Sequence, residues 1–308
     1  MTSMRSFVLC AFLATAAALP AQGQSRRDDG RFFGRGAPGR LDTTVALNSG
    51  GRVALTTRQG DITVRTGTGN QVIVHAVSDR GRIRFDASPD RVAVDASDDV
   101  GDVRFEITVP PGARISAESQ NGDVSVRGTG GDVSVHTQNG DAVVDGAAGH
   151  IEFGTLSGDI TASHLKGDVA ASSVSGDITL SDVAGDITAS SVSGDVKLRG
   201  ITSRSVDAQT TGGDVSFAGA IDPSGRYQLT THSGDVTLEL PEKASAQLTV
   251  STWSGSIDSD FPITLQPGEH GIGVATSKRF TFNIGGGEAR ISAETFSGDV
   301  VIRRRPSK

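Results

Sequence analysis

Apolar and polar positions alternate over short segments in the middle of the chain, and these segments recur every nine residues. Gly stands at positions 122, 131, 140, 149, 158, 167, 176, 185 and 194, and Asp follows each of them except Gly149, which is followed by His150. The third and fifth residues of each segment are Val, Ile, Ala, Leu or Phe, and the fourth is mostly Ser or Thr. This period of two predicts a short β-strand whose third and fifth side chains point inward.

A fixed repeat of this kind is the sequence signature of a solenoid. A closer repeat of 18 residues starts at Ser173 (SVSGDITLSDVAGDITAS), so two segments are expected to complete one coil with two sheets. Gly tolerates the positive φ that a corner needs, and Asp can accept hydrogen bonds from nearby backbone N–H groups. The sequence therefore predicts an all-β fold, a β-solenoid or β-helix whose strands are spaced about 4.8 Å apart.

The eighth residue of the later segments is also apolar, and it is expected to point inward after a bend. These residues are Leu156, Leu165, Val174, Val183, Val192 and Ile201. Trp253 and Phe296 stand at the equivalent place before a Ser-Gly pair. Packing in the core or in a cap is therefore expected of both rings.

The Gly-Asp pair recurs at wider spacing on both sides of the regular block. It stands at 60–61, 101–102, 213–214, 234–235 and 298–299, with Gly255-Ser256 as a variant. The gaps from 101 to 122, from 213 to 234 and from 234 to 255 are each 21 residues, and each of these longer units is expected to carry an extra strand. Wider rungs at both ends would cap the solenoid, whose exposed edges must be kept soluble.

The first 23 residues are typical of a secretory signal peptide. Arg5 supplies the positive charge, residues 7–19 form an apolar run too short to span a bilayer, and Ala21-Gln22-Gly23 suits cleavage. Residues 24–40 predict an Arg/Gly-rich linker, with a tether to anionic envelope polymer, anchored by Phe32-Phe33, as the alternative. The expected organisation is signal peptide 1–23, linker 24–40, β-solenoid 41–304 and tail 305–308.

Composition agrees with a thin core in an exported protein. The chain has 40 Gly among 308 residues, with 36% hydrophobic and 5% aromatic residues, so large side chains are few. Its single cysteine, Cys10, lies inside the apolar run, so the mature chain is expected to lack disulfides and thiolate chemistry. The net charge of −7 argues against nucleic acid as a partner.

The repeated S-G-D-[IV] strands, the Pro-containing corners and the closing segment IGGGEARISAETFSGDVVIR at 284–303 resemble a known family. It is a bacterial family of β-strand-repeat domains commonly labelled "putative adhesin", of unknown function. The resemblance covers roughly residues 41–304. It implies a β-solenoid on the cell-envelope side of the membrane, and it implies no ligand and no functional residues.

Calcium is the main cofactor to consider, because nonapeptide repeats of another type bind Ca²⁺ between coils. Two segments per coil would align Asp123, Asp141, Asp159, Asp177 and Asp195 along one edge, and Asp132, Asp168 and Asp186 along the other. The G-x-G-x-D spacing that builds an oxygen cage is missing. A role of these carboxylates in turn hydrogen bonds is the simpler interpretation, and a cation ladder is the alternative.

A catalytic reading, such as a polysaccharide-acting β-helix enzyme, has little support in the sequence. Most acidic residues obey the repeat, whereas a catalytic site usually breaks it, and no nucleophile, zinc or phosphate-binding motif is present. The six histidines are scattered, with His150 and His164 expected to face solvent. We therefore predict no enzyme, no catalytic residues and no required cofactor.

The remaining candidates are binding surfaces. Sugar stacking would need exposed aromatic rings, for which Trp253, Tyr227 and Phe296 are the candidates. Outward-facing rows of Ser and Thr would form a flat polar face, made by Ser125, Ser134, Thr161, Thr179 and Thr188. The sequence thus predicts an exported, adhesin-like structural or binding module that meets an envelope polymer or a surface protein, in the periplasm, on the outer surface or outside the cell.

Overall fold

The computed structural model describes residues 32–33, 39–98, 101–262 and 278–305. The contacts divide the chain into two units, residues 1–30 and 31–308, and all of the described strands belong to the second. The predicted signal peptide, Cys10 and most of the predicted linker and tail lie outside the described residues. No described helix is long and apolar enough to cross a membrane.

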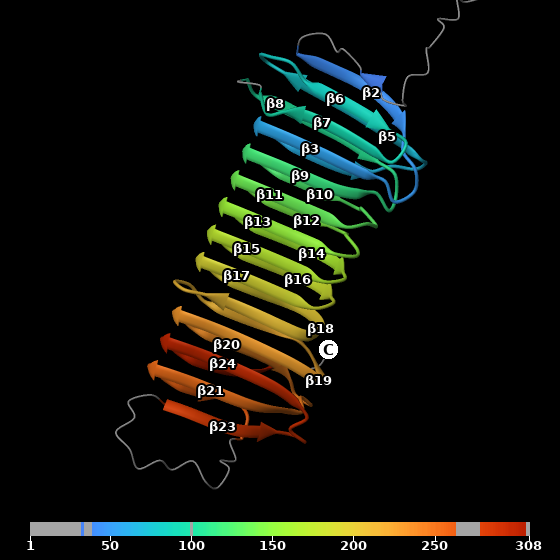
Figure 1. Ribbon diagram of the computed structural model, residues 1–308. Coiled ribbons are helices and arrows are strands. Elements are labelled where there is room, and N and C mark those ends of the chain that lie inside the picture. Colours follow the sequence, from blue (N-terminus) through green and yellow to red (C-terminus); the bar gives the residue numbers. More distant parts are fainter. Residues whose placement is uncertain (1–31, 34–38, 99–100, 263–277, 306–308) are drawn as a thin grey trace, which may run out of the picture. The chain divides into compact units, whose positions relative to one another are not determined.

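The described part of the chain folds into β-strands that stack as the coils of a β-solenoid (Figure 1). The strands of its first part are β1 (Phe32–Phe33), β2 (Arg40–Ala46), β3 (Arg52–Gln59), β4 (Ile62–Thr66), β5 (Gln71–Ser78), β6 (Arg84–Ser88), β7 (Arg91–Ala96) and β8 (Val103–Val109). The regular centre contains β9 (Arg114–Asn121), β10 (Val124–Arg127), β11 (Val133–Asn139), β12 (Ala142–Asp145), β13 (Ile151–Ser157), β14 (Ile160–Lys166), β15 (Val169–Ser175), β16 (Ile178–Ala184) and β17 (Ile187–Ser193). The last part contains β18 (Val196–Thr210), β19 (Val215–Ser233), β20 (Val236–Pro241), β21 (Ala246–Ser254), β22 (Ile257–Ser259), β23 (Lys278–Ile284), β24 (Ala289–Ser297) and β25 (Val300–Arg305).

Two parallel sheets face each other across the core, and each coil contributes one strand to each sheet. Strands β9, β11, β13, β15 and β17 pair in the first sheet, and β10, β12, β14 and β16 pair in the second. The pairing register is 18 residues, as in Ile160 with Ile178, which confirms the predicted coil of two segments. The long strands β18 and β19 run through both sheets.

The core is a narrow layer of Val, Ile, Leu and Ala between the two sheets. The third and fifth residues of each segment are buried, as predicted; Ile178 and Leu180 are both fully buried, whereas Thr179 between them is half-buried. Few large rings take part, and the largest fully buried side chains include Phe153, Phe217 and Tyr227. A thin core is sufficient because each strand of the regular centre is hydrogen-bonded to the strands of the coils above and below it.

The stacking order differs from the sequence order at both ends. β3 lies between β7 and β9, and β24 lies between β19 and β21; in Figure 1 a blue strand follows teal ones and a red strand separates orange ones. Antiparallel strands finish each end: β6 on β7, β5 on β8 and β23 on β21. Each end of the solenoid is thus capped by strands that run antiparallel to their neighbours.

The 21-residue units carry two strands each, one more than a nine-residue segment, so the predicted extra strand is present. The unit after Gly213 has one strand in each sheet, both within β19, and its register with β18 jumps between Ser203 and Ser205, where the partner moves from Ile221 to Arg226. The residues in excess of the regular 18-residue coil therefore widen a corner. Each strand of a parallel ladder must pair with a strand of the next coil. Additional residues therefore fit only at a corner, where the chain forms no such pairs.

The prediction for the eighth residue is correct in one sheet and wrong in the other. Leu165, Val183 and Ile201 in the second sheet are buried, as expected. In the first sheet, Leu156, Val174 and Val192 are 52%, 42% and 49% exposed, and Trp253 and Phe296 are 48% and 47% exposed. Tyr227, the third ring considered for sugar stacking, is buried instead, and its hydroxyl donates to the carbonyl of Ser203 at 2.7 Å.

The difference arises at the seventh residue. In the second sheet it has a positive φ, at Gly146, His164, Asp182 and Gly200, and this left-handed residue breaks the alternation so that the eighth side chain turns inward. In the first sheet the seventh residue is a buried Ser or Thr, such as Thr155. The strand there continues with period two, and the eighth side chain therefore points to solvent.

Candidate functional site: an exposed apolar ridge and its groove

The eighth residues of the first sheet line up along one edge of the stack. In stacking order they are Leu156, Val174, Val192, Thr211, His232, Phe296 and Trp253, here called the apolar ridge. Five of the seven large apolar side chains that are exposed in the described ranges belong to it; the other two are Val77 and Phe280. Monomeric soluble proteins rarely gather exposed apolar side chains in one place, and such a patch is typical of an interaction site.

Three rings continue the ridge as a stacked ladder. The centroids of His232 and Phe296 are 4.8 Å apart with an interplanar angle of 12°, and those of Phe296 and Trp253 are 5.8 Å apart at 9°. Each ring stands on a different rung, so the strand spacing of the sheet sets their separation. Both faces of Phe296 are consequently covered by its neighbours, so its edge points outward.

Buried hydroxyls hold the strand ends below the ridge. Thr210, Thr231, Thr295 and Thr252 lie one residue before the ridge positions, and each hydroxyl donates to a glycine carbonyl of the neighbouring rung at 2.8 to 2.9 Å. A buried hydroxyl needs such a partner, since an unpaired one costs about 1–3 kcal/mol. These bonds connect the rungs below Thr211, His232, Phe296 and Trp253, whereas the buried hydroxyls of Thr155 and Ser173, below Leu156 and Val174, have no hydrogen-bond partner among the described residues.

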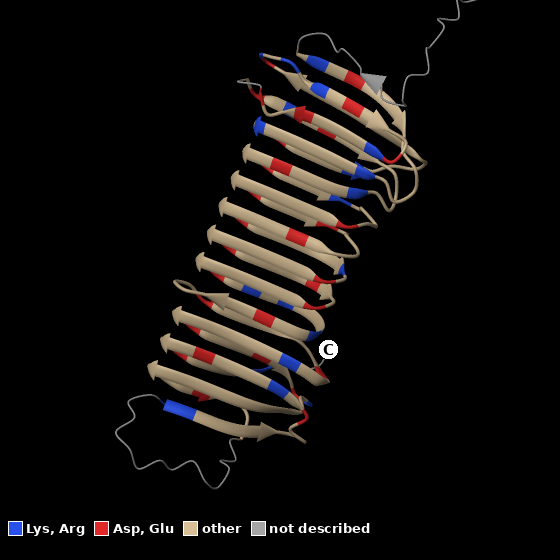
Figure 2. Ribbon diagram, in the orientation of Figure 1, with Lys and Arg blue, Asp and Glu red and all other residues tan. Residues whose placement is uncertain are grey.

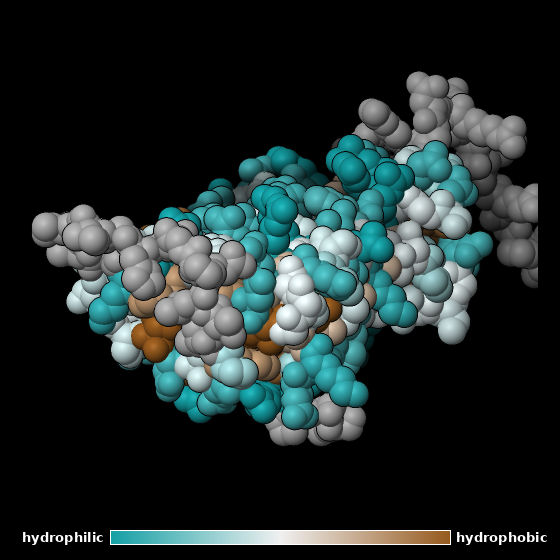
Figure 3. Space-filling view, turned by 90° about the horizontal axis from the view of Figure 1, so that it is seen from below, coloured by the Kyte–Doolittle hydropathy of each residue, from teal (hydrophilic) through white to brown (hydrophobic). Residues whose placement is uncertain are grey.

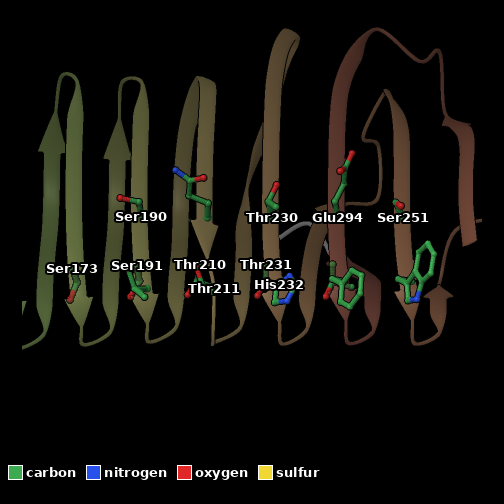
Figure 4. A pocket seen from close by; sticks show the side chains of 15 residues that line it. Ser173, Ser190, Ser191, Thr210, Thr211, Thr230, Thr231, His232, Ser251 and Glu294 are labelled. Carbon is green, nitrogen blue, oxygen red and sulfur yellow. The ribbon is translucent and has the colours of Figure 1, made fainter. Parts of the chain in front are cut away.

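A shallow groove of about 580 Å³ runs along the inner side of the ridge (Figure 4). Its second wall is the outward residue two positions earlier on each strand, here called the polar column: Ser190, Gln209, Thr230, Glu294 and Ser251. Neither Lys nor Arg is among the residues that line the groove, and Glu294 is the one carboxylate. Its Oε1 accepts from the Ser292 hydroxyl at 3.0 Å and lies 3.5 Å from the Arg279 guanidinium.

On the outer side of the ridge the corner aspartates form a continuous hydrogen-bonded column (Figure 2 shows the acidic residues that recur at the corners). The Oδ1 of each Asp accepts the backbone N–H of the Asp on the next rung, at 2.8 to 3.1 Å, through Asp61, Asp123, Asp141, Asp159, Asp177, Asp195, Asp214, Asp235 and Asp299. The five aspartates predicted to align along one edge are therefore brought together. The sequence predicts a hydrogen bond within the turn, whereas in the structure the bond runs to the next rung, 18 residues away along the chain.

Hydrogen bonds and one lysine stabilise the charged form of two members of this column, Asp195 and Asp299. The N–H of Asp214, and then Lys197, lower the pKa of Asp195 below its usual value. Lys197 lies 2.9 Å from Asp195 and 3.1 Å from Asp177 and thus offsets their mutual repulsion. At the end of the column the N–H of Ser256 lowers the pKa of Asp299.

The other edge of the solenoid carries the shorter row of aspartates that the sequence predicts there. Asp132 accepts from the N–H of His150 at 3.0 Å, and Asp168 and Asp186 continue the pattern. His150 and His164 face solvent, as predicted. No group of three or more His, Cys, Asp or Glu side chains that could hold a metal ion occurs within the described ranges. The Ca²⁺ ladder stays a prediction, which a melting curve in EDTA and then in Ca²⁺ would test.

A second hollow of about 440 Å³ lies on the other sheet, and Asp182, Glu239, Arg199 and Arg305 are among its lining residues. Asp182 follows Ser181 on β16, whereas Glu239 is on β20, three rungs away through Arg199 and Ala218. Three strand spacings are about 14 Å, which exceeds the separation of paired carboxylates in glycoside hydrolases. This hollow therefore does not bring two acids together.

Sequence reasoning missed the ridge because apolar eighth residues occur in both sheets. A usable signal was present one position earlier. The seventh residue is Gly, His or Asp in the second sheet, and these tolerate a left-handed backbone; it is Ser or Thr in the first. A β-branched Thr strongly disfavours that conformation, so this alternation predicts which eighth residues are exposed.

Comparison with known proteins gives a family and no activity. No curated protein sequence matches the chain. A solved structure described as a putative cell adhesion protein from Clostridium sporogenes aligns with 86% of this chain and 100% of its own, at 9% identity and a TM-score of 0.25. Residues 106–303 match the Toastrack DUF4097 profile, and the chain therefore belongs to the Toastrack DUF4097 family.

Proposed function

We propose that this protein is an exported, adhesin-like binding module of the bacterial cell envelope, without catalytic turnover, and that its partner lies along the apolar ridge and the groove. The observation that carries this proposal is the concentration of exposed apolar side chains in one straight ridge. Burying such side chains against a partner gains about 25 cal/mol per Å² of apolar surface. The paired strands hold the backbone in place, so the ordering cost of binding is confined to the side chains.

Export is supported by the sequence of residues 1–23, with its positive start, short apolar run and small residues at a cleavage position. Periplasm, outer surface and extracellular space all fit that segment. A solenoid held by backbone hydrogen bonds and packing also needs no disulfide to be stable outside the cytoplasm.

The absence of turnover is supported by the placement of the acidic residues. Those of the corner column are engaged by backbone N–H groups of the next rung, and the groove beside the ridge has Glu294 as its one carboxylate. General acid–base catalysis by carboxylates needs a second group at a matched distance. The groove is suited to binding an extended partner and not to acid–base catalysis.

Cosedimentation with purified envelope fragments tests the proposal. The protein obtained from the full chain should pellet with the fragments, and Val192→Asp should reduce the bound fraction at least fivefold because it places a charge in the middle of the ridge. Thr179→Asp is the matched control, since it adds the same charge to an outward position of the other sheet. Equal binding of both variants, or no binding of the parent protein, would refute a role of the ridge.

A further inference from the structure

The groove beside the ridge is suited to one chemical class of ligand. We propose that it binds an uncharged polysaccharide strand, with the strand lying parallel to the stack axis between the polar column and the apolar ridge. This inference rests on the proposed function and names the ligand of the same site. It goes further because it specifies charge, shape and the role of each wall.

The two walls differ in chemistry and run side by side. The wall formed by Ser190, Gln209, Thr230 and Ser251 offers hydroxyl and amide groups that both donate and accept hydrogen bonds. The opposite wall offers Val192, His232, Phe296 and Trp253. A sugar ring has hydroxyls around its rim and C–H groups on its faces, so a strand of such rings can satisfy both walls at once.

The groove is long and narrow. It crosses the rungs of β15, β17, β18, β19, β24 and β21, which at about 4.8 Å per rung is about 24 Å. Its walls stand two residues apart on each strand, or about 7 Å. Only an extended chain fills such a space. Figure 4 shows the labelled side chains of the polar column spread over successive strands in this way.

Charge excludes anionic polymers and anionic lipid surfaces. The groove is lined by no Lys or Arg and by one carboxylate. The column that includes Asp177, Asp195 and Asp214 follows the far side of the ridge, three residues along the chain from Val192 in the case of Asp195. An anionic strand would meet no Lys or Arg among the lining residues and would be repelled by this column, less so near Lys197, which pairs with Asp177 and Asp195; a neutral strand would not be repelled.

An extended peptide fits less well, because the floor of the groove has no free backbone. Strands β17, β18, β19, β24 and β21 are each paired on both sides in this region, so their N–H and C=O groups are used within the sheet. Strand addition needs such groups to be free. Side-chain hydroxyls and amides are what remains for recognition, and they match a hydroxyl-bearing chain.

A second copy of this chain would bury too little surface here. The ridge and the polar column together span about 29 Å along the stack and about 7 Å across it, or about 200 Å² on each partner, against about 800 Å² in a standard stable interface.

The view of the stack from the β23 end shows apolar side chains, in brown, among hydrophilic ones, in teal (Figure 3). That end lies beyond the groove and is not part of the proposed site.

The stacked rings act as an apolar wall and not as separate stacking platforms. Phe296 lies between His232 and Trp253, so both of its faces are covered and its edge meets the groove. Its contribution should therefore depend on apolar volume and not on aromaticity. Phe296→Leu should keep the wall, and Phe296→Ser should remove it.

Affinity electrophoresis in gels that contain a soluble glycan tests the proposal with defined probes. Hydroxyethyl cellulose, amylose and dextran are the neutral probes, polygalacturonate is the anionic one, and sedimentation velocity is run in parallel. We expect retardation by at least one neutral glycan and none by polygalacturonate. Trp253→Ser and Phe296→Ser should weaken retardation by about tenfold or more in Kd, while Phe296→Leu and the control Val77→Ser stay near the parent value. Melting curves verify that every variant is folded.

Three results would overturn the inference. They are retardation by the anionic glycan alone, binding of envelope fragments without binding of any neutral probe, and dimerisation that Trp253→Ser abolishes. The second leaves the proposed function intact, and the third assigns the ridge to a second copy. Equal loss of binding in Phe296→Leu and Phe296→Ser would overturn the wall assignment.

Discussion

A corner glycine in this protein meets two separate requirements. Gly167 has a φ of +130°, which side chains with a Cβ rarely adopt, and a Cβ built on it would lie 2.0 Å from the carbonyl oxygen of Gly149 on the neighbouring rung. The first requirement is conformational and the second is steric. Because the coils are only about 4.8 Å apart, the corner has no room for any other residue, and this explains why glycine recurs once per strand.

Gly167→Ala should therefore be far more costly than an ordinary glycine substitution. We expect a loss of about 3 kcal/mol or more in the free energy of unfolding, from strain and overpacking together. Gly50→Ala is the control: its φ is +73°, but no atom lies within 4 Å of the added Cβ, so about 1 kcal/mol is expected. Urea unfolding measures both values, and equal losses would contradict the steric argument.

The corner aspartate makes stability depend on pH in a defined direction. Because the pKa of Asp195 is lowered on folding, its contribution is present above its unfolded value of 3.8 and is lost as the pH falls through the folded pKa. Asn keeps the acceptor oxygen for the N–H of Asp214 but does not titrate. Asp195→Asn should thus show a smaller decline in unfolding free energy between pH 5 and pH 2 than the parent.

The control for this titration is Asp195→Ala, which removes the acceptor. It should cost about 1 kcal/mol at pH 7, the usual net value of one hydrogen bond. Denaturant curves at several pH values give all three profiles. An Asn variant that is as acid-sensitive as the parent would show that other carboxylates govern the decline.

At the scale of the element, one backbone feature decides which way a side chain points. Both sheets start with the same buried third and fifth residues, and they separate at the seventh. His164, with φ +54°, turns the following Leu165 inward, whereas the extended Thr155 leaves Leu156 exposed. The apolar ridge and the second sheet's core row thus come from the same sequence position.

The in–out alternation of a single strand can be tested in β16. Ile178→Asp should destabilise the fold by several kcal/mol, because the side chain is fully buried between Ile160 and Val196 and the charge would have no partner. Thr179→Asp should change stability by less than about 0.5 kcal/mol, since that side chain reaches solvent. Thermal melts compare the two, and similar melting temperatures would mean that the register is wrong.

At the scale of the whole solenoid unit, the ends are built from segments that are distant in sequence. β24 is held on one side by β19 and on the other by β21, and β25 lies between β20 and β22. The last described strands are therefore internal rungs. β3 has the equivalent place at the other end, between β7 and β9. Such non-local pairing is slow to form, but it places β24 and β25, the last described strands, inside the stack.

Deletion of residues 289–308 should consequently do more than shorten the stack. The strands β21, β22 and β23 would lose the rung that connects them to β19 and β20, so protease cleavage within residues 242–262 should increase at least tenfold. Deletion of residues 306–308 is the control, which should leave cleavage unchanged. Limited proteolysis followed by mass spectrometry locates the cuts, and a protected 242–262 segment in the longer deletion would contradict this account.

The sequence by itself determined the solenoid, its 18-residue coil, the buried third and fifth residues and the alignment of the corner aspartates. These follow from local rules: a period of two, glycine at tight corners and a fixed repeat length. Only the tertiary structure decided the order of the end rungs and the burial of Tyr227. Insertion of β24 between β19 and β21 sets Phe296 between His232 and Trp253. The ring ladder is thus made by pairing strands that the chain order keeps apart, and no local pattern encodes that pairing.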